Sequence, residues 1–108
     1  MRTHKLSLAL VSASILLLSV VVPSVFSEVM LQFFNNSWNE IEDKIPELSE
    51  VGYTALWLPP PQKCSGGSSV GYDLWDPLDL GGKDQRSTVR TRYGTEAELL
   101  RMIETAHR

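Results

Sequence analysis

The chain has 108 residues, of which 43% are apolar, with 10 Lys and Arg, 13 Asp and Glu and a single Cys. This length fits one small domain and excludes a closed barrel of eight strand–helix units, which takes about 250 residues. One cysteine excludes both an internal disulfide framework and a zinc site built from cysteines.

The first 27 residues differ from the rest. Two basic residues precede the uncharged stretch Leu6 to Val22, and Pro23 and Val25-Phe26-Ser27 follow it. This order predicts a secretory signal peptide over residues 1–27, cleaved after Ser27, and therefore a secreted or extracytoplasmic protein. Because the apolar stretch reaches the lower limit of a membrane span, an uncleaved anchor is the alternative. Membrane contact is expected only during export, or if the signal stays uncleaved.

The remaining residues, 28–108, carry 8 basic and 13 acidic side chains, which gives a net charge of −5. Affinity for nucleic acids comes largely from Lys and Arg side chains that neutralise phosphates. The acidic balance therefore argues against a nucleic-acid partner.

The first strand–helix unit begins at Val29. Val29 to Phe34 is a short apolar run that predicts a strand buried on both faces, as in parallel sheets. Ser37 and Glu40 form a capping box. The helix that follows has an apolar stripe at helical spacing, made of Trp38, Ile41, Ile45 and Leu48. Pro46 predicts a kink or a restart, and Gly52 predicts the helix end.

A second unit follows the same plan. Tyr53 to Leu58 predicts a strand, which three prolines end. Thr95 and Glu98 form a second capping box, and the closing helix is expected to bury one face, made of Leu99, Leu100, Ile103 and Ala106. His107 is interpreted as an ordinary residue at the helix end. Strand, helix, strand, long connection and helix predict the start of a parallel α/β fold.

The connection from Pro59 to Thr95 is about 35 residues long, and loops of that length are usually functional. It also leaves the carboxyl end of a strand, where parallel α/β folds build their sites. The Gly- and Ser-rich run Cys64 to Ser69 predicts a flexible tip, with Cys64 as an incidental free thiol.

Three aspartates and several aromatic residues are the candidate site residues of this connection. Asp73, Asp76 and Asp79 recur at every third position. Carboxylates so spaced bind a cation such as Ca²⁺ or cap turns and pair with Lys83, Arg86 or Arg90; the structural role is favoured because the Gly and Glu of a helix–loop–helix calcium site are missing. Tyr72 follows Gly71 and is the better candidate for stacking on a sugar ring, whereas Trp57 lies mid-strand and is predicted to be core.

Three segments, in order, resemble the α-amylases of glycoside hydrolase family 13. Gly52 to Pro60 (GYTALWLPP) resembles the second-strand region, and Val70 to Gly81 (VGYDLWDPLDLG) resembles the loop that follows it. Thr88 to Thr95 (TVRTRYGT), with Glu98-Leu99 and Ala106-His107, resembles the approach to the second barrel helix. Together they cover most of Val29 to Arg108.

The resemblance implies that residues 28–108 are the N-terminal portion of a family 13 catalytic domain. They would form the first two strand–helix units of a (β/α)8 TIM barrel, incomplete and preceded by the signal peptide. The implied activity of a full-length parent is retaining hydrolysis of an α-glucan such as starch or a maltooligosaccharide. Tyr72 inherits stacking on the sugar bound at the scissile position, and Asp76 is a second candidate contact. Pro59, Trp57 and the aspartates inherit mainly architectural roles.

The family's nucleophile Asp, acid/base Glu and third catalytic Asp come from strands four, five and seven, and no segment of this chain matches them. No catalytic residue is therefore assigned, and the chain alone is predicted to be inactive. No metal or cofactor is predicted for this chain; the resemblance allows Ca²⁺ in the full-length parent.

Three interpretations of function follow. The first is the front piece of a secreted α-amylase-type glycoside hydrolase. The second is a non-catalytic remnant that contacts glucan through Tyr72. The third is a membrane-anchored, barrel-like subunit without catalysis, which requires the N-terminal stretch to stay uncleaved.

Overall fold

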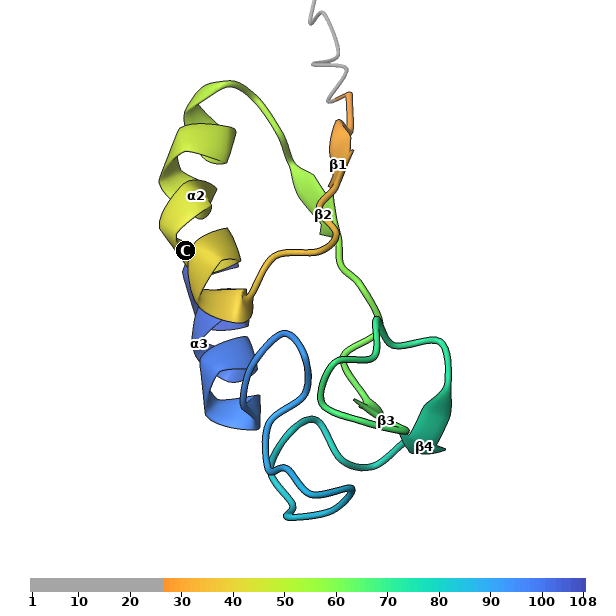
Figure 1. Cartoon of the computed structure of the whole chain (residues 1–108). Coiled ribbons are helices and arrows are strands. Elements are labelled where there is room, and N and C mark those ends of the chain that lie inside the picture. The colour runs from red at the N-terminus through yellow and green to blue at the C-terminus, as the bar shows by residue number, and fades with distance from the viewer. Residues whose placement is uncertain (1–26) are drawn as a thin grey trace, which may run out of the picture.

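The computed structural model describes residues 27–108. In chain order its elements are β1 (Met30–Gln32), α2 (Trp38–Glu50), β2 (Ala55–Trp57), β3 (Lys63–Cys64), β4 (Leu74–Asp76) and α3 (Glu96–Ala106). The two helices lie along one side of the β1–β2 pair, and the segment with β3 and β4 gathers beyond the carboxyl end of β2 (Figure 1). The predicted signal peptide, apart from its last residue, lies outside the described residues. None of the helices within residues 27–108 has the length and hydropathy that a membrane crossing needs.

β1 and β2 pair in parallel, with Leu31 opposite Leu56 and Gln32 opposite Trp57. The prediction that Val29 to Phe34 forms a strand buried on both faces is wrong, because Met30 and Gln32 of β1 are exposed and Leu31 is only partly buried. The strand β2 is likewise covered on one face only. Leu56 packs toward the helices, whereas side chains alternate along a strand, so Trp57 points the other way and is 55% exposed. Within the described residues no second layer covers that face, so Trp57, expected in the core, is not part of it. The described strands form two two-stranded sheets and no closed barrel.

Both predicted capping boxes are confirmed. The Ser37 side chain accepts from the Glu40 N–H, and the Glu40 carboxylate accepts from the Ser37 N–H at 2.7 Å; Thr95 and Glu98 do the same at the start of α3. α2 runs through Pro46 without a restart. It ends where expected, because Gly52 adopts a φ of +99° and the Tyr53 N–H reaches the Leu48 carbonyl at 3.0 Å, as in a Schellman motif.

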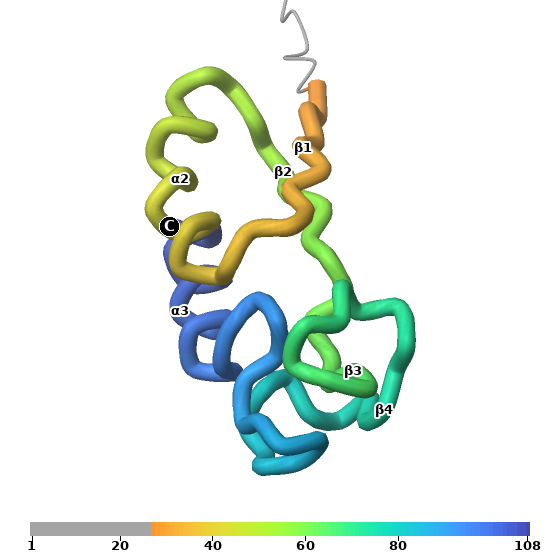
Figure 2. Tube along the Cα trace, viewed as in Figure 1, coloured from red at the N-terminus to blue at the C-terminus, as the bar shows by residue number. Residues whose placement is uncertain are grey.

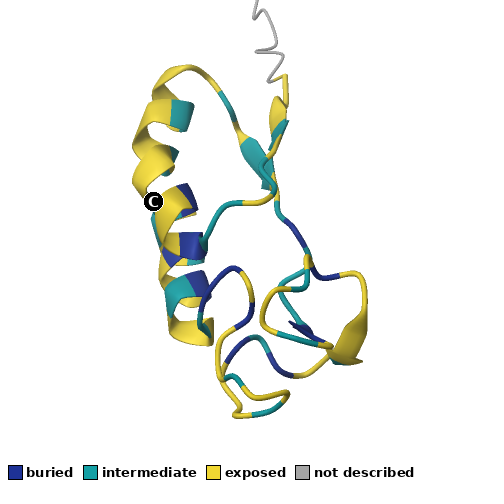
Figure 3. Ribbon diagram, in the orientation of Figure 1, coloured by how far each residue is buried: buried dark blue, intermediate teal, exposed yellow. Residues whose placement is uncertain are grey.

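The core lies between the two helices and includes Tyr93, which comes shortly before α3. Trp38 and Ile41 of α2 meet Leu99 and Met102 of α3, and the Trp38 ring packs against that of Tyr93 with centroids 5.3 Å apart. In Figure 3 the buried parts of the helices accordingly lie on their inner faces. The predicted stripe of α2 is confirmed, with Ile45 and Leu48 only partly buried.

The predicted face of α3 is partly wrong. Leu99 is buried and Ile103 half-buried, but Leu100 and Ala106 are exposed, and Met102 takes their place. Positions three and four apart share a helix face, so Leu99, Met102 and Ile103 form the buried stripe. Leu100 lies beside this stripe and Ala106 continues it at the helix end, where both are exposed. Polar links then join the helices at their rim: Arg101 pairs with Glu42 at 2.9 Å and donates to Asn39 at 2.6 Å.

The connection from Pro59 to Thr95 is not one featureless loop. β3 and β4 pair antiparallel, and isolated bridges join Gln85 to Thr88 and Thr91 to Gly94. Figure 2 shows the chain doubling back repeatedly between β2 and α3. Cys64 is a free cysteine, as predicted, but it lies in β3 and not in a flexible tip. Its side chain is buried, and its thiol donates to the Gln62 carbonyl at 3.1 Å. Burial raises the pKa of this thiol, which lowers its reactivity.

Candidate functional site

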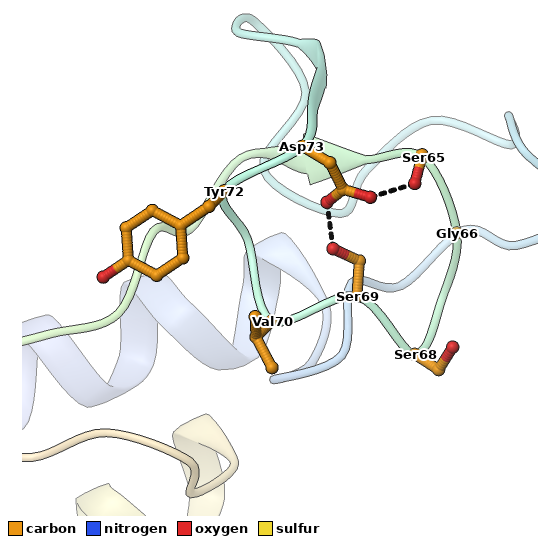
Figure 4. Close-up of a pocket in the computed structure, with 7 residues that line it drawn as sticks. All are labelled: Ser65, Gly66, Ser68, Ser69, Val70, Tyr72 and Asp73. Atoms are coloured by element: carbon orange, nitrogen blue, oxygen red, sulfur yellow. Dashed lines mark hydrogen bonds between the residues drawn. The ribbon is translucent and has the colours of Figure 1, made fainter.

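The segment 65–73, called here the tip loop, joins β3 to β4 within the connection that leaves the carboxyl end of β2. Its residues line a shallow depression, drawn in Figure 4: Ser65, Gly66, Ser68, Ser69, Val70, Tyr72 and Asp73. The structure therefore places Tyr72, the predicted sugar-stacking residue, at this depression. It places Asp76 outside it.

The backbone that leads into Tyr72 is fixed, while the ring of Tyr72 is exposed. The side chain is 72% exposed, and in Figure 4 its ring points away from the serines and Asp73. Gly71 is buried with a φ of +118°, and a Cβ there would lie 2.9 Å from Cβ of Pro60. Only glycine fits this backbone and this close approach. The Val-Gly-Tyr sequence thus turns sharply against Pro60 and presents the tyrosine outward.

Asp73, the residue after Tyr72, is bound by two hydroxyls. Ser65 Oγ donates to one carboxylate oxygen and Ser69 Oγ to the other, as the dashed lines in Figure 4 show. Hydrogen bonds from Ser65 and then Ser69 lower the pKa of this carboxyl below its usual value. We refer to this arrangement of three side chains as the Asp73 clasp.

Three side chains from the segment 86–93 hold the tip loop from outside. Arg86 donates to the Ser65 carbonyl at 2.8 Å, Arg92 to the Ser68 carbonyl at 2.9 Å, and the Tyr93 hydroxyl to the Val70 carbonyl at 2.6 Å. The prediction of a flexible tip is therefore corrected. Gly and Ser composition indicates a flexible chain only where no distant groups satisfy its backbone, and here they do.

Lys63 and Asp79 form a buried ion pair at the base of the tip loop. Each side chain is 1% exposed or less, and Lys63 Nζ lies 3.6 Å from Asp79 Oδ2. The ammonium also donates to the carbonyls of Thr88, at 2.8 Å, and Val89. The Lys63 N–H donates to the Asp79 carbonyl at 2.7 Å. Lys63 thereby joins β3 to two later parts of the connection.

Both oxygens of the Asp79 carboxylate accept hydrogen bonds. Its Oδ1 accepts the N–H groups of Gly81 and Gly82 at 2.9 Å and of Lys83 at 3.1 Å, and its Oδ2 accepts from Gln85 at 2.8 Å. Burial opposes ionisation, but the hydrogen bonds from Gln85 and the three backbone N–H groups outweigh it. The pKa of Asp79 therefore lies well below its usual value.

The structural role predicted for the aspartates is confirmed, and one predicted pairing is found. Asp76 pairs with Lys83 at 3.1 Å and accepts from Gln85 at 2.8 Å and from the Leu78 N–H at 2.9 Å. Asp79 instead pairs with Lys63, which the sequence did not single out. Among residues 27–108 no group of three His, Cys, Asp or Glu side chains is placed to hold a metal ion. Substrate contacts by Tyr72 and Asp76 stay predictions.

The turn at Arg86 and Ser87 was also missed. Both residues have left-handed backbones, with φ of +57° and +64°, in a tight hairpin where Gln85 and Thr88 exchange backbone hydrogen bonds. Left-handed residues other than glycine are uncommon. Arg86 lies over the Trp75 ring at 4.5 Å from its centroid, while the Trp75 indole N–H donates to Gln85 at 3.3 Å. No glycine, asparagine or aspartate marks this turn in the sequence.

Comparison with known proteins identifies relatives of one kind. An α-amylase of Geobacillus stearothermophilus is 40% identical over 89 residues, which is 76% of this chain and 16% of that protein. A cytoplasmic α-amylase of Escherichia coli (strain K12) is 42% identical over 72 residues, covering 66% of this chain and 14% of the relative. The chain belongs to the α-amylase family. A glucan 1,4-α-maltohexaosidase of Bacillus sp. (strain 707) is 39% identical over 77 residues, with 65% and 15% covered. No family model matches the chain.

These comparisons confirm the resemblance seen in the sequence and set its extent. The chain spans 14% to 16% of the length of these three relatives. The relationship supports a segment derived from the family's barrel.

The predicted secreted or extracytoplasmic location is contradicted. The E. coli relative is named as a cytoplasmic α-amylase, so membership of this family does not place a chain outside the cell. The prediction had rested on residues 1–27, of which 1–26 lie outside the described residues.

Replacing Lys63 by Met should destabilise the fold strongly. The change leaves the Asp79 carboxylate buried without its cation and removes the donor from the Thr88 and Val89 carbonyls. Breaking a buried pair in this way costs about 3–5 kcal/mol, measured as the free energy of unfolding in urea. Lys83→Met is the matched control, because the Lys83 side chain is exposed and such pairs contribute at most about 1 kcal/mol. Equal losses in the two variants would contradict the assignment.

Asp79 should also make stability depend on pH. Its native pKa is lowered and the pKa of an unfolded Asp is about 3.9, so the unfolded chain binds the proton first as pH falls. The stabilisation is therefore present above about pH 4 and is lost as the pH falls further, through the native pKa. Urea unfolding from pH 6 to pH 2 should show the difference between the wild type and Asp79→Asn shrinking below pH 4. With the exposed Asp84→Asn as control, a pH-independent difference for Asp79→Asn would count against this role.

Proposed function

We propose that the chain serves in an α-amylase-type glycoside hydrolase that acts on starch-type glucans, and that Tyr72 contributes a stacking surface for a glucose ring. The relatives, named as α-amylases and a maltohexaosidase, support the class of substrate. The observation that carries the proposal for this chain is the exposed Tyr72 ring on a tip loop pinned beyond the carboxyl end of β2. Parallel α/β folds place their ligand sites at that end of their strands.

Physical chemistry favours this role for Tyr72. The face of an aromatic ring buries the apolar face of a sugar, while polar groups bond the sugar hydroxyls. A ligand loses less free energy on binding to a site that is already ordered. Tyr72 has both properties, because its ring is free and its neighbours are fixed by Pro60, Tyr93 and the Asp73 clasp.

We further propose that this chain binds glucan without cleaving it. Retaining hydrolysis requires two carboxyl groups about 5–5.5 Å apart, one nucleophilic and one protonated. Asp73, Asp76 and Asp79 do not supply the protonated partner, because hydrogen bonds keep the pKa of each below its usual value. A non-catalytic glucan-contacting role is therefore the second candidate function.

The purified 108-residue chain should release no reducing sugar from soluble starch. The physical reason is that hydrogen bonds lower the pKa of Asp73, Asp76 and Asp79, the carboxyls of the candidate site, so none of the three is poised as an acid. The measurement is a reducing-end assay against a buffer blank, with an intact bacterial α-amylase as positive control. Starch hydrolysis above the blank that copurifies with the chain would refute this part of the proposal.

Tyr72→Ala should weaken binding of maltoheptaose about three- to tenfold, because it removes the stacking face. Titration calorimetry on the full chain measures the dissociation constant, and retardation in starch-containing gels gives an independent reading. Tyr72→Phe keeps the ring and should bind like the wild type. Leu78→Ala, at another exposed apolar side chain, controls for general loss of apolar surface. A Tyr72→Ala chain that binds as the wild type does would rule out the proposed contact.

A further inference from the structure

The Asp73 clasp lies on the exposed surface, yet both oxygens of its carboxylate are occupied. Ser65 Oγ and Ser69 Oγ, eight and four residues earlier, donate to opposite oxygens. The backbone adds a bond from the Ser65 N–H to the Asp73 carbonyl at 3.1 Å. The two ends of the tip loop are thus tied together at the residue that follows Tyr72.

The side chains that bond the tip loop from the segment 86–93 all reach carbonyls that precede Tyr72. The side chains of Arg86, Arg92 and Tyr93 bond carbonyls of residues 65, 68 and 70, and Pro60 blocks movement at Gly71. After Tyr72 the chain is held by the bond from the Ser65 N–H to the Asp73 carbonyl, by the pairing of β4 with β3, and by the Asp73 side chain. A side chain keeps one direction only when the backbone is held on both sides of it, and the clasp adds two side-chain bonds to the hold that follows Tyr72.

The clasp also limits what else the depression can do. Hydroxyls that donate to a carboxylate form charge-assisted hydrogen bonds, which are stronger than those between neutral groups. Ser65 and Ser69 therefore have their donors committed to Asp73. The two serines therefore stabilise the loop. Tyr72 remains the side chain in the depression that offers a large exposed face to a ligand.

We infer that Asp73 is a positioning residue, which orders the backbone that presents the Tyr72 ring to an α-glucan by binding Ser65 and Ser69. The inference rests on the proposed function for its ligand, but the ordering of Tyr72 by Asp73 stands on the contacts of the tip loop alone. Asp73 thus affects how well one side chain, Tyr72, is ordered. The clasp is exposed and outside the core formed by Trp38, Ile41 and Leu99, so global stability should hardly depend on it.

The first experiment measures the order of Tyr72 without any sugar. The chain has three tyrosines, so ¹³C-labelled tyrosine gives three ring signals, assigned by single Tyr→Phe substitutions. In Asp73→Ala the Tyr72 ring should show faster relaxation typical of a mobile side chain, while Tyr53 and Tyr93 keep their wild-type values. Asp84→Asn is the control, because Asp84 makes no hydrogen bond or ion pair within residues 27–108. Unchanged Tyr72 relaxation in Asp73→Ala would overturn the inference, whatever the chain binds.

The second experiment connects the clasp to glucan binding. Asp73→Ala should raise the dissociation constant for maltoheptaose about three- to tenfold, because the ring must then be ordered on binding. Ser65→Ala combined with Ser69→Ala should weaken binding to the same extent. Ser69→Thr alone, which keeps the hydroxyl, should bind maltoheptaose like the wild type. In a Tyr72→Ala background the Asp73 change should add nothing, since the two residues act through one ring. The urea midpoint should stay at the wild-type value throughout.

The outcomes separate the two claims. If Tyr72→Ala weakens binding but Asp73→Ala does not, the positioning role is overturned and the proposed function stands. If Tyr72→Ala has no effect while Asp73→Ala mobilises the Tyr72 ring, the proposed contact fails and the ordering of the ring by Asp73 is supported. A fall in affinity for Asp73→Ala that persists in the Tyr72→Ala background overturns the role, because Asp73 then acts on binding by another route.

Discussion

Lys63 and Asp79 lie on either side of the segment that carries Tyr72, and their side chains meet in the interior. This pair closes the base of the tip loop, while the same ammonium binds the carbonyls of Thr88 and Val89. A buried charge is tolerated only when its hydrogen-bonding capacity is satisfied. The bonds from Lys63 to these carbonyls therefore help to fix the position of the 85–92 segment. Arg86 and Arg92 of that segment, with the adjoining Tyr93, then hold the tip loop, so the presentation of Tyr72 depends on the buried pair.

Local signals in the sequence predicted local structure well. The capping residues Ser37, Glu40, Thr95 and Glu98 bond their own helix ends, and Gly52 ends α2 through its own backbone freedom. These features depend on residues no more than five positions apart. Each signal and its partner therefore lie together in the printed sequence, and tertiary packing does not override them.

The failed predictions concern residues whose surroundings come from far along the chain. Lys63 looks like an ordinary surface lysine, and its burial follows from partners 16 to 26 residues away. The tip loop looked flexible because its composition says nothing of Arg86, Arg92 and Tyr93. Trp57 looked like core because a strand sequence does not reveal which of its faces another layer covers. The resemblance of the Val-Gly-Tyr motif identified Tyr72, but not the groups that orient it.

The contacts that hold the tip loop join residues that are far apart in the chain. Arg86, Arg92 and Tyr93 bond carbonyls 21, 24 and 23 residues earlier in the chain. Closing loops of that length costs conformational entropy, whereas each helix cap joins residues only three positions apart. The tip loop therefore depends on contacts that offset a larger loss of entropy than the helix caps do. By the same reasoning it opens early when the native state fluctuates, so hydrogen exchange at the tip should report on this subregion well before the helices loosen.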